Sequence, residues 1–167
     1  MPGKVRAIPE GYHTITPHLV IKGADKAVEF YQKAFGAQQL GGVFRSPDGK
    51  VAHAELQIGD SRIMLADEFP GMGADSSPQT LGGASGHLFI YTDNVDHLFD
   101  QAVKAGATVV MPLMDQFWGD RYGQVKDPFG QVWAMGQHVE DIAPAEMERR
   151  GKEAFAKAAQ ASAAGHK

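Results

Sequence analysis

Four side chains that can bind a metal or move a proton stand at related positions in this sequence. The pattern His-Leu-x-Ile occurs twice and begins at His18 and again at His87. His53 and Glu55 are two residues apart, so both would point to the same face of a strand. Imidazole nitrogens and carboxylate oxygens bind divalent cations, and they also act as general acids and bases. The spacing therefore predicts a polar site for which either chemistry is open.

The two His-Leu-x-Ile patterns belong to a longer repeat. Each is followed by a polar turn and by a segment whose apolar residues form one helical stripe, and each predicted helix ends in Gly-Ala, at 36–37 and 106–107. Asp25 and Asp93 are the predicted N-terminal caps of these helices. A repeat on this scale indicates that a whole supersecondary unit has been duplicated.

Three strands are predicted after each helix, so each unit has the order βαβββ. The clearest strand is 51–58, where small and apolar residues alternate with His53, Glu55 and Gln57, which should lie on the face away from the helix. The fold class is α+β, with tandem βαβββ modules forming a curved mixed sheet, or cup, and helices on the outer face. The predicted strands are 14–21, 39–45, 51–58, 61–66, 86–91, 108–112, 121–126 and 131–136.

One domain is expected over residues 1–138, made of modules at about 13–68 and 86–138. Residues 69–85 are rich in Gly, Ser and Pro and are interpreted as the linker between the modules, which could act as a mobile flap. Residues 139–167 should form a C-terminal helical tail. Its helix is predicted from Pro144 to Ala164, with an interruption at Gly151.

The composition narrows the class of protein. The chain has 167 residues, of which 43% are apolar and 22% charged, so it can bury a core. It has no cysteine and a net charge of −4, which exclude a disulfide scaffold and disfavour nucleic acid as a partner. No apolar run approaches the roughly 20 residues that cross a bilayer. We expect a cytoplasmic protein without a membrane partner.

Several motifs follow one another in a characteristic order: Ala27–Tyr31 with Phe35–Ala37, Val51–Glu55, Ile63–Asp67, Phe117–Gly123 and Asp127–Gly130. Together with the βαβββ repeat, they resemble the vicinal oxygen chelate superfamily, which contains glyoxalase I, bleomycin-resistance proteins and extradiol dioxygenases, and within it the PhnB-like branch. The resemblance covers about residues 9–148.

The resemblance implies a cup that holds a small oxygen-bearing ligand, often completed across a homodimer. Its enzymes hold one divalent metal ion, such as Zn, Ni, Mn or Fe, on His or Glu from the first and last strands of each module. The matching residues here are His18, His87 and Asp67. The last strand departs from the pattern, because Ala134 stands where glyoxalase I has a glutamate. The sequence therefore favours ordinary cavity histidines over metal ligands at these positions.

Aromatic residues near one edge of the second module suit a ligand-binding wall. The candidates for substrate binding are Phe89, Tyr91, Trp118, Arg121 and Tyr122, with Arg121 able to hold an anionic oxygen through two hydrogen bonds. The alternatives are a structural salt bridge between Asp120 and Arg121, and a Trp118 that belongs to the core.

Two functions from different classes follow. In the first, the chain is a metal-assisted lyase, isomerase or dioxygenase, with His53 and Glu55 as catalytic residues. In the second, it is a metal-free protein of the bleomycin-resistance type that sequesters a planar compound between aromatic side chains. Ala134 favours the second and His87 favours the first. For His53 and Glu55, the alternative to catalysis is a polar lining of the cavity.

Overall fold

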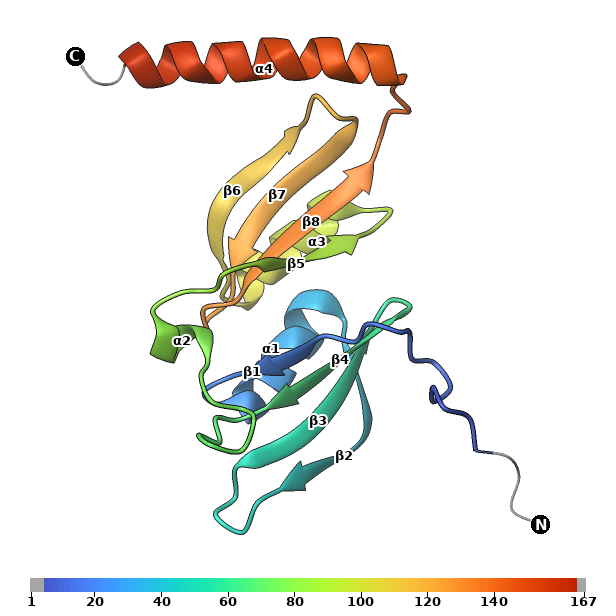
Figure 1. Cartoon of the computed structure of the whole chain (residues 1–167), viewed down its shortest axis with the longest axis vertical. Coiled ribbons are helices and arrows are strands. Elements are labelled where there is room, and N and C mark those ends of the chain that lie inside the picture. The colour runs from blue at the N-terminus through green and yellow to red at the C-terminus, as the bar shows by residue number, and fades with distance from the viewer. Residues whose placement is uncertain (1–4, 165–167) are drawn as a thin grey trace.

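A computed structural model describes residues 5–164 as two four-stranded sheets, one above the other, with helices α1 and α3 between and behind them (Figure 1). The elements are β1 (His18–Val20), α1 (Ala24–Phe35), β2 (Gln38–Arg45), β3 (Val51–Ile58), β4 (Ser61–Ala66), α2 (Pro78–Leu81), β5 (His87–Tyr91), α3 (Val95–Ala105), β6 (Thr108–Asp115), β7 (Asp120–Lys126), β8 (Val132–His138) and α4 (Pro144–Ala164).

The two sheets have the same topology, which confirms the predicted duplication. The first has the order β1-β4-β3-β2 and the second β5-β8-β7-β6. In each, the first and last strands of the module are parallel and the other neighbours are antiparallel. The α+β class and the βαβββ order are therefore as predicted. No helix in the described part of the chain is long and apolar enough to cross a bilayer.

Most predicted boundaries hold, and the exceptions have local causes. The first strand is shorter than predicted because the segment before His18 ends in Pro17, which lacks an N–H and pairs only through its carbonyl, with Met64 N at 2.9 Å. The linker at 69–85 contains the short helix α2, capped by Ser77, whose hydroxyl accepts from Thr80 N at 3.4 Å.

The predicted helix caps were wrong at both positions. Helix α1 begins at Ala24, and the carboxylate of Asp67 accepts from its first N–H groups, while Asp25 pairs with Arg45. In α3 the cap is Asn94 rather than Asp93, because its side chain accepts from His97 N at 3.2 Å. The Gly36 cap with left-handed backbone is as predicted.

One core joins the two modules. The helix-facing residues of β3 and β4 are buried against α1, and the aromatic residues of α1 reach the second module, where Tyr31 and Phe35 lie 5.1 Å and 4.6 Å from Trp133 between ring centroids. The hydroxyl of Tyr31 donates to the buried Asp127 at 2.7 Å. The modules therefore share apolar contacts and a buried polar bond.

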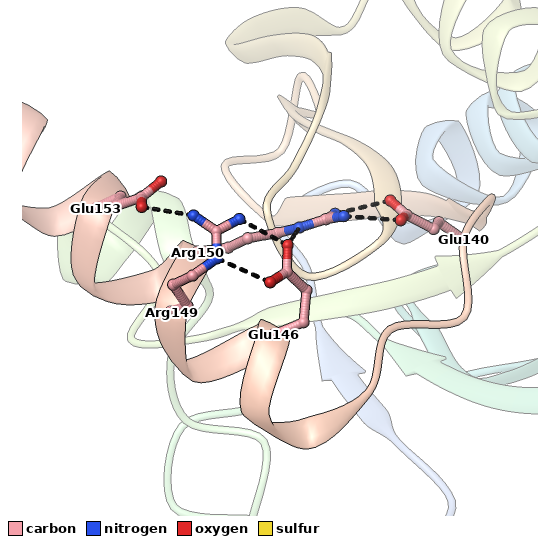
Figure 2. A network of polar contacts seen from close by, with 5 residues as sticks. All are labelled: Glu140, Glu146, Arg149, Arg150 and Glu153. Carbon is pink, nitrogen blue, oxygen red and sulfur yellow. Dashed lines mark hydrogen bonds and ion pairs between the residues drawn. The ribbon is translucent and has the colours of Figure 1, made fainter.

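Helix α4 lies across the end of the second sheet (Figure 1). Arg150 donates to both oxygens of Glu140 at 2.8 and 2.9 Å and to Glu146 at 2.7 Å, and Arg149 bridges Glu146 and Glu153 (Figure 2). The predicted interruption at Gly151 was wrong, because the helix continues through it.

Gly151 has a packing role in α4. It is buried, and a Cβ built there would lie 3.3 Å from the ring of Phe117. The missing side chain thus lets the helix approach that ring.

Candidate functional site

The face of the first sheet that turns away from α1 carries a chain of hydrogen bonds. His53 donates through Nε2 to Glu55 at 3.0 Å, and the Tyr12 hydroxyl donates to the other oxygen of Glu55. His53 and Glu55 lie on this face because their neighbours Ala54 and Leu56 are buried against the helix. The structure thus brings the two predicted catalytic residues together and adds Tyr12.

These contacts shift the titration of the groups involved. Hydrogen bonds from Tyr12 and His53 lower the pKa of Glu55, so this carboxylate stays ionised. Burial and the hydrogen bond to Glu55 raise the pKa of Tyr12. Because Glu55 accepts the Nε2 proton, a neutral His53 presents Nδ1 as its basic nitrogen. The arrangement can accept one proton at a defined atom.

His18 joins this group from the neighbouring strand. Its ring centroid lies 6.1 Å from that of His53, in an edge-to-face arrangement. Burial, followed by the charge of His53, lowers the pKa of His18, so its imidazole is kept neutral. His18 also lines a cavity of about 430 Å³ bounded by the linker, including Pro78, Leu81 and Ser85. The linker therefore borders the cavity that His18 lines.

The predicted metal ligands are not brought together. Asp67 is occupied, since its Oδ1 accepts from Gly23 N and Ala24 N at 2.9 Å and its Oδ2 from Val51 N at 2.8 Å. Across residues 5–164 no group of three or more His, Cys, Asp or Glu side chains could hold a metal ion. A divalent ion normally needs three or four protein ligands, so the residues present do not fit one.

His87 stands alone at the start of its strand. It is exposed and pairs in register with Val132, whereas His18 pairs with Met64. Neither partner offers the nitrogen or oxygen donor that a zinc, nickel, manganese or iron(II) site would take here. The repeated histidines therefore occupy equivalent backbone positions with different surroundings.

The face of the second sheet that turns away from α3 carries four aromatic side chains, which we call the aromatic wall: Phe89, Tyr91, Trp118 and Tyr122. Between ring centroids, Phe89 lies 4.4 Å from Tyr91 and 5.5 Å from Tyr122, and Trp118 lies 5.6 Å from Tyr122. Phe89 and Tyr91 remain 42% and 64% exposed. Four of the five predicted substrate-binding residues are thus brought together on one surface.

A buried carboxylate holds the wall in place. Asp120 is 4% exposed and accepts from the Tyr91 hydroxyl at 2.9 Å, from Trp118 Nε1 at 3.2 Å and from His138 Nδ1 at 2.9 Å. The bond to Asp120 raises the pKa of Tyr91, so its hydroxyl remains a donor. Asp120 therefore fixes two aromatic residues and one imidazole at once.

Arg121, the fifth predicted substrate-binding residue, lies elsewhere. Its guanidinium donates to both oxygens of Asp96 in α3, at 2.7 and 2.8 Å, and to Asp115 at 3.2 Å. It pairs with these two acids rather than with Asp120, the partner considered from the sequence. Its neighbours in β7, Asp120 and Tyr122, face the wall because strand residues alternate.

Sequence reasoning missed Tyr12, Asp120 and His138. Alternation in 120–126 would have placed Asp120 on the same face as Tyr122, and the aromatic residues around it indicated a polar anchor. His138 follows from the pairing of β7 with β8, in which it stands opposite Asp120. Tyr12 had no such signal, because it lies in the lead-in segment before the first strand.

Comparison with known proteins agrees with this architecture. Residues 12–135 match the family model described as the Glyoxalase/Bleomycin resistance protein/Dioxygenase superfamily. The chain belongs to this superfamily. The match ends before α4, so this helix lies outside the region that the family model covers.

Relatives and solved structures share most of the two modules. The uncharacterized protein Mb0911c from Mycobacterium bovis is 47% identical over 130 residues, 77% of this chain and 85% of that protein. The structure of TioX from Micromonospora sp. ML1 is 29% identical with a TM-score of 0.57, covering 76% of this chain and 99% of that one. The PhnB protein from Bacillus cereus, at 20% identity, has the same fold with a TM-score of 0.58 over 75% of this chain and 99% of that one.

Proposed function

We propose that this protein binds a small planar compound on the aromatic wall, without a metal ion, in the manner of the bleomycin-resistance type. The observation that carries the proposal is the anchoring of the wall. Tyr91 and Trp118 donate to the same oxygen of the buried Asp120, so their rings are held in position before a ligand arrives. Flat conjugated molecules gain most from such fixed aromatic surfaces.

The metal-assisted alternative has less support. His18, His87 and Asp67 do not form a ligand set, and both oxygens of Asp67 hold backbone N–H groups. The proposed function therefore involves no metal ion. Reconstitution with zinc, nickel, manganese or iron(II) should leave well under one equivalent bound; stoichiometric metal that is lost in a His18→Ala/His87→Ala variant would overturn this part.

Fluorescence titration tests binding at the wall. Trp118 lies in the wall and Trp133 is buried in the core, so quenching by a planar probe such as acridine or naphthalene should be saturable and should disappear in Trp118→Phe. Phe89→Ala should weaken the binding of the probe by about tenfold, in line with the loss of one stacked ring.

Gly136 offers a sharper variant. A Cβ built at Gly136 would lie 2.6 Å from Cζ of Phe89, so Gly136→Ala must displace that ring without removing an aromatic group. Phe44→Leu is the matched control, since Phe44 is an exposed aromatic residue on the first sheet. Equal binding by wild type and Gly136→Ala, or no quenching by any planar probe, would overturn the proposal.

A second function, acid–base catalysis on the first sheet, is favoured by the chain that links Tyr12, Glu55 and His53. With its Nε2 proton donated to an ionised Glu55, His53 can take a proton at Nδ1 from a carbon next to a carbonyl group. His18, whose pKa is lowered, supplies a neutral imidazole nearby.

Hydrogen exchange measures this activity directly. Exchange of the carbon-bound hydrogens of dihydroxyacetone in D2O, followed by proton NMR, should be faster with wild type than with His53→Gln. His97→Gln is the control, because His97 is exposed on α3. Equal exchange rates for the wild type and His53→Gln would exclude this catalytic role.

We also propose that two copies associate in the cytoplasm. The exposed fractions of Phe89 and Tyr91 leave the aromatic wall uncovered in a single chain, and a second copy would close it. Light scattering should give a particle of twice the 18.0 kDa chain mass. A monomer at micromolar concentration would contradict this assembly.

A further inference from the structure

A cavity of about 440 Å³ lies where the two modules meet, and Phe89 and Tyr91 of the aromatic wall are among its lining residues. It is bounded by the lead-in segment before β1, the turn between β3 and β4, and strand β5. This volume is within the range of about 300–1,000 Å³ typical of small-molecule sites. We call it the seam cavity. Its apolar lining includes Ile58, Ile63, Leu88, Ile90 and Trp133.

Arg62 lines the same cavity and has an unsatisfied donor. Its Nε is buried and has no hydrogen-bond partner among the described residues. Four other arginines, Arg45, Arg121, Arg149 and Arg150, each pair with a carboxylate. Arg62 forms no such pair within residues 5–164. After the hydrogen bonds from Tyr12 and His53, the charge of Arg62 also lowers the pKa of Glu55, but no carboxylate forms an ion pair with Arg62 in the described residues. Because a buried guanidinium donor without a partner is costly, an anion bound at Arg62 would offset that cost.

The lead-in segment holds the guanidinium in place. Its central carbon lies 4.5 Å from the ring centroid of Tyr12, a cation–π contact. On the other side, a Cβ at Gly11 would fall 2.3 Å from one terminal nitrogen of Arg62, and the backbone there has a φ of +80°. Only glycine lets the chain pass so close. Arg62 is thus oriented before any ligand binds.

The polar groups at the cavity agree with a single anionic head group. Ser61 and Thr16 also line the cavity, but their hydroxyls already donate to Asp60 and to the carbonyl of His13, which leaves Arg62 as the donor for a ligand. The one acid among the lining residues, Asp60, already accepts from the Ser61 hydroxyl at 2.9 Å. The guanidinium and the apolar lining together match a molecule with an apolar body and one carboxylate.

We propose that the seam cavity is a second binding site, which takes a small amphiphilic carboxylate with its head group on Arg62 and its apolar body against Ile63, Ile90 and Trp133. The cavity shares Phe89 and Tyr91 with the aromatic wall, whereas Arg62 and Trp133 belong to the cavity alone. The contact of the head group with Arg62 therefore distinguishes this site from planar-compound binding beside Trp118. Its ligand class is set by the guanidinium of Arg62 and by the apolar residues that make up most of the lining.

Trp133 provides a reporter for this site. In a Trp118→Phe background it is the single tryptophan, and it both lines the cavity and is buried. Titration with decanoate below its micelle concentration should change Trp133 emission saturably. Decanol, with the same chain and no charge, should bind at least tenfold more weakly.

Two variants test the assigned contacts in that background. Arg62→Gln should weaken decanoate binding at least tenfold and remove the preference over decanol, while Arg45→Gln, an exposed arginine paired with Asp25, should change neither. Ser61→Phe, at an exposed lining position, should block both probes without altering the core.

The outcomes separate this site from the aromatic wall. Planar-probe binding is measured from the emission of Trp118 and tests the proposal for the aromatic wall. Decanoate binding is measured from the emission of Trp133 and tests the seam cavity. Equal affinity for decanoate and decanol, unchanged binding in Arg62→Gln, or decanoate binding that survives Ser61→Phe would each overturn the seam site, whatever the result at the wall.

Discussion

Replacing Tyr31 with phenylalanine removes one buried polar bond between the two modules and leaves their apolar contacts and the bonds from Gln101 to the carbonyls of Lys33 and Ala34. Tyr31 is fully buried in α1, and its hydroxyl donates to Oδ2 of Asp127 at 2.7 Å. That oxygen also accepts from Trp133 Nε1 at 3.0 Å, and Oδ1 accepts from Phe129 N and Gln131 N. After the substitution Asp127 keeps three donors and loses one.

The loss can be estimated from the kind of bond removed. Hydrogen bonds to a charged group contribute about 1.5–3 kcal/mol. The phenyl ring retains the stacking on Phe35 and the edge-to-face contact with Trp133. We therefore expect the free energy of unfolding to fall by about 1.5–3 kcal/mol at pH 7. Tyr122→Phe is the matched control. Its buried hydroxyl accepts from Gln124 at 2.6 Å within one strand, so the loss should be nearer 1 kcal/mol.

The pH dependence of this stability loss shows whether the Tyr31 hydroxyl acts on the ionised form of Asp127. Burial raises the pKa of Asp127, and the Tyr31 hydroxyl opposes this rise. The contribution of Tyr31 to stability is therefore present when Asp127 is ionised and is lost as the pH falls through the pKa of Asp127. Urea unfolding of wild type and Tyr31→Phe between pH 4 and 8 measures the difference.

Two results would refute this account of the junction. A loss below about 0.5 kcal/mol at pH 7 would mean that the bond contributes no more than an exposed contact. A loss that is the same at every pH would mean that the hydroxyl acts through packing and not through the carboxylate. Cooperative loss of both modules in one transition is expected for wild type, because Tyr31 and Asp127 come from different modules.

Three further changes test the surrounding network. Tyr12→Phe should raise the pKa of Glu55 toward its ordinary value, because the hydrogen bond from Tyr12 is the largest of the contacts that lower this pKa. A carbon-13 titration of the Glu55 carboxyl measures the pKa, and an unchanged value would contradict the hydrogen bond. Hydrogen bonds with Asp141 and then with Asp120 raise the pKa of His138. The stability that protonated His138 gives the fold is therefore present below pH 6.5 and is lost as the pH rises through the raised pKa. The melting temperature of His138→Gln should vary less between pH 6 and 8 than that of wild type. Gly151→Leu should push α4 from the Phe117 ring and speed proteolysis of the tail, with Ala156→Leu on the exposed helix surface as control; equal cleavage of both would contradict the packing role.

Local pattern was enough to predict much of the fold. Strands Val51–Ile58 and Ser61–Ala66 begin and end where the sequence placed them, because each is flanked by a turn containing glycine and has clear alternation or a compact apolar run. Helix Ala24–Phe35 ends at Gly36, whose φ of +65° suits its position as a cap. These features depend on neighbours in the chain.

Contacts between distant segments could not be predicted in the same way. Asp67 follows a strand and was assigned to a metal site, yet its oxygens serve the first turn of α1 and Val51 N. Nothing near Asp67 in the sequence marks the helix that it caps. Arg121 likewise finds Asp96 across the sheet–helix interface. A carboxylate or guanidinium can serve structure or chemistry, and only its partners decide which.

The duplication explains why the fold could be predicted more fully than the site. Equivalent backbone positions recur because both modules place apolar residues at the same positions against a helix. The opposite face of each sheet is free of that requirement. On the first sheet it carries His18, His53 and Glu55, and on the second it carries Phe89 and Tyr91. A repeated histidine therefore marks a repeated position, while the chemistry at that position depends on side chains that the repeat does not constrain.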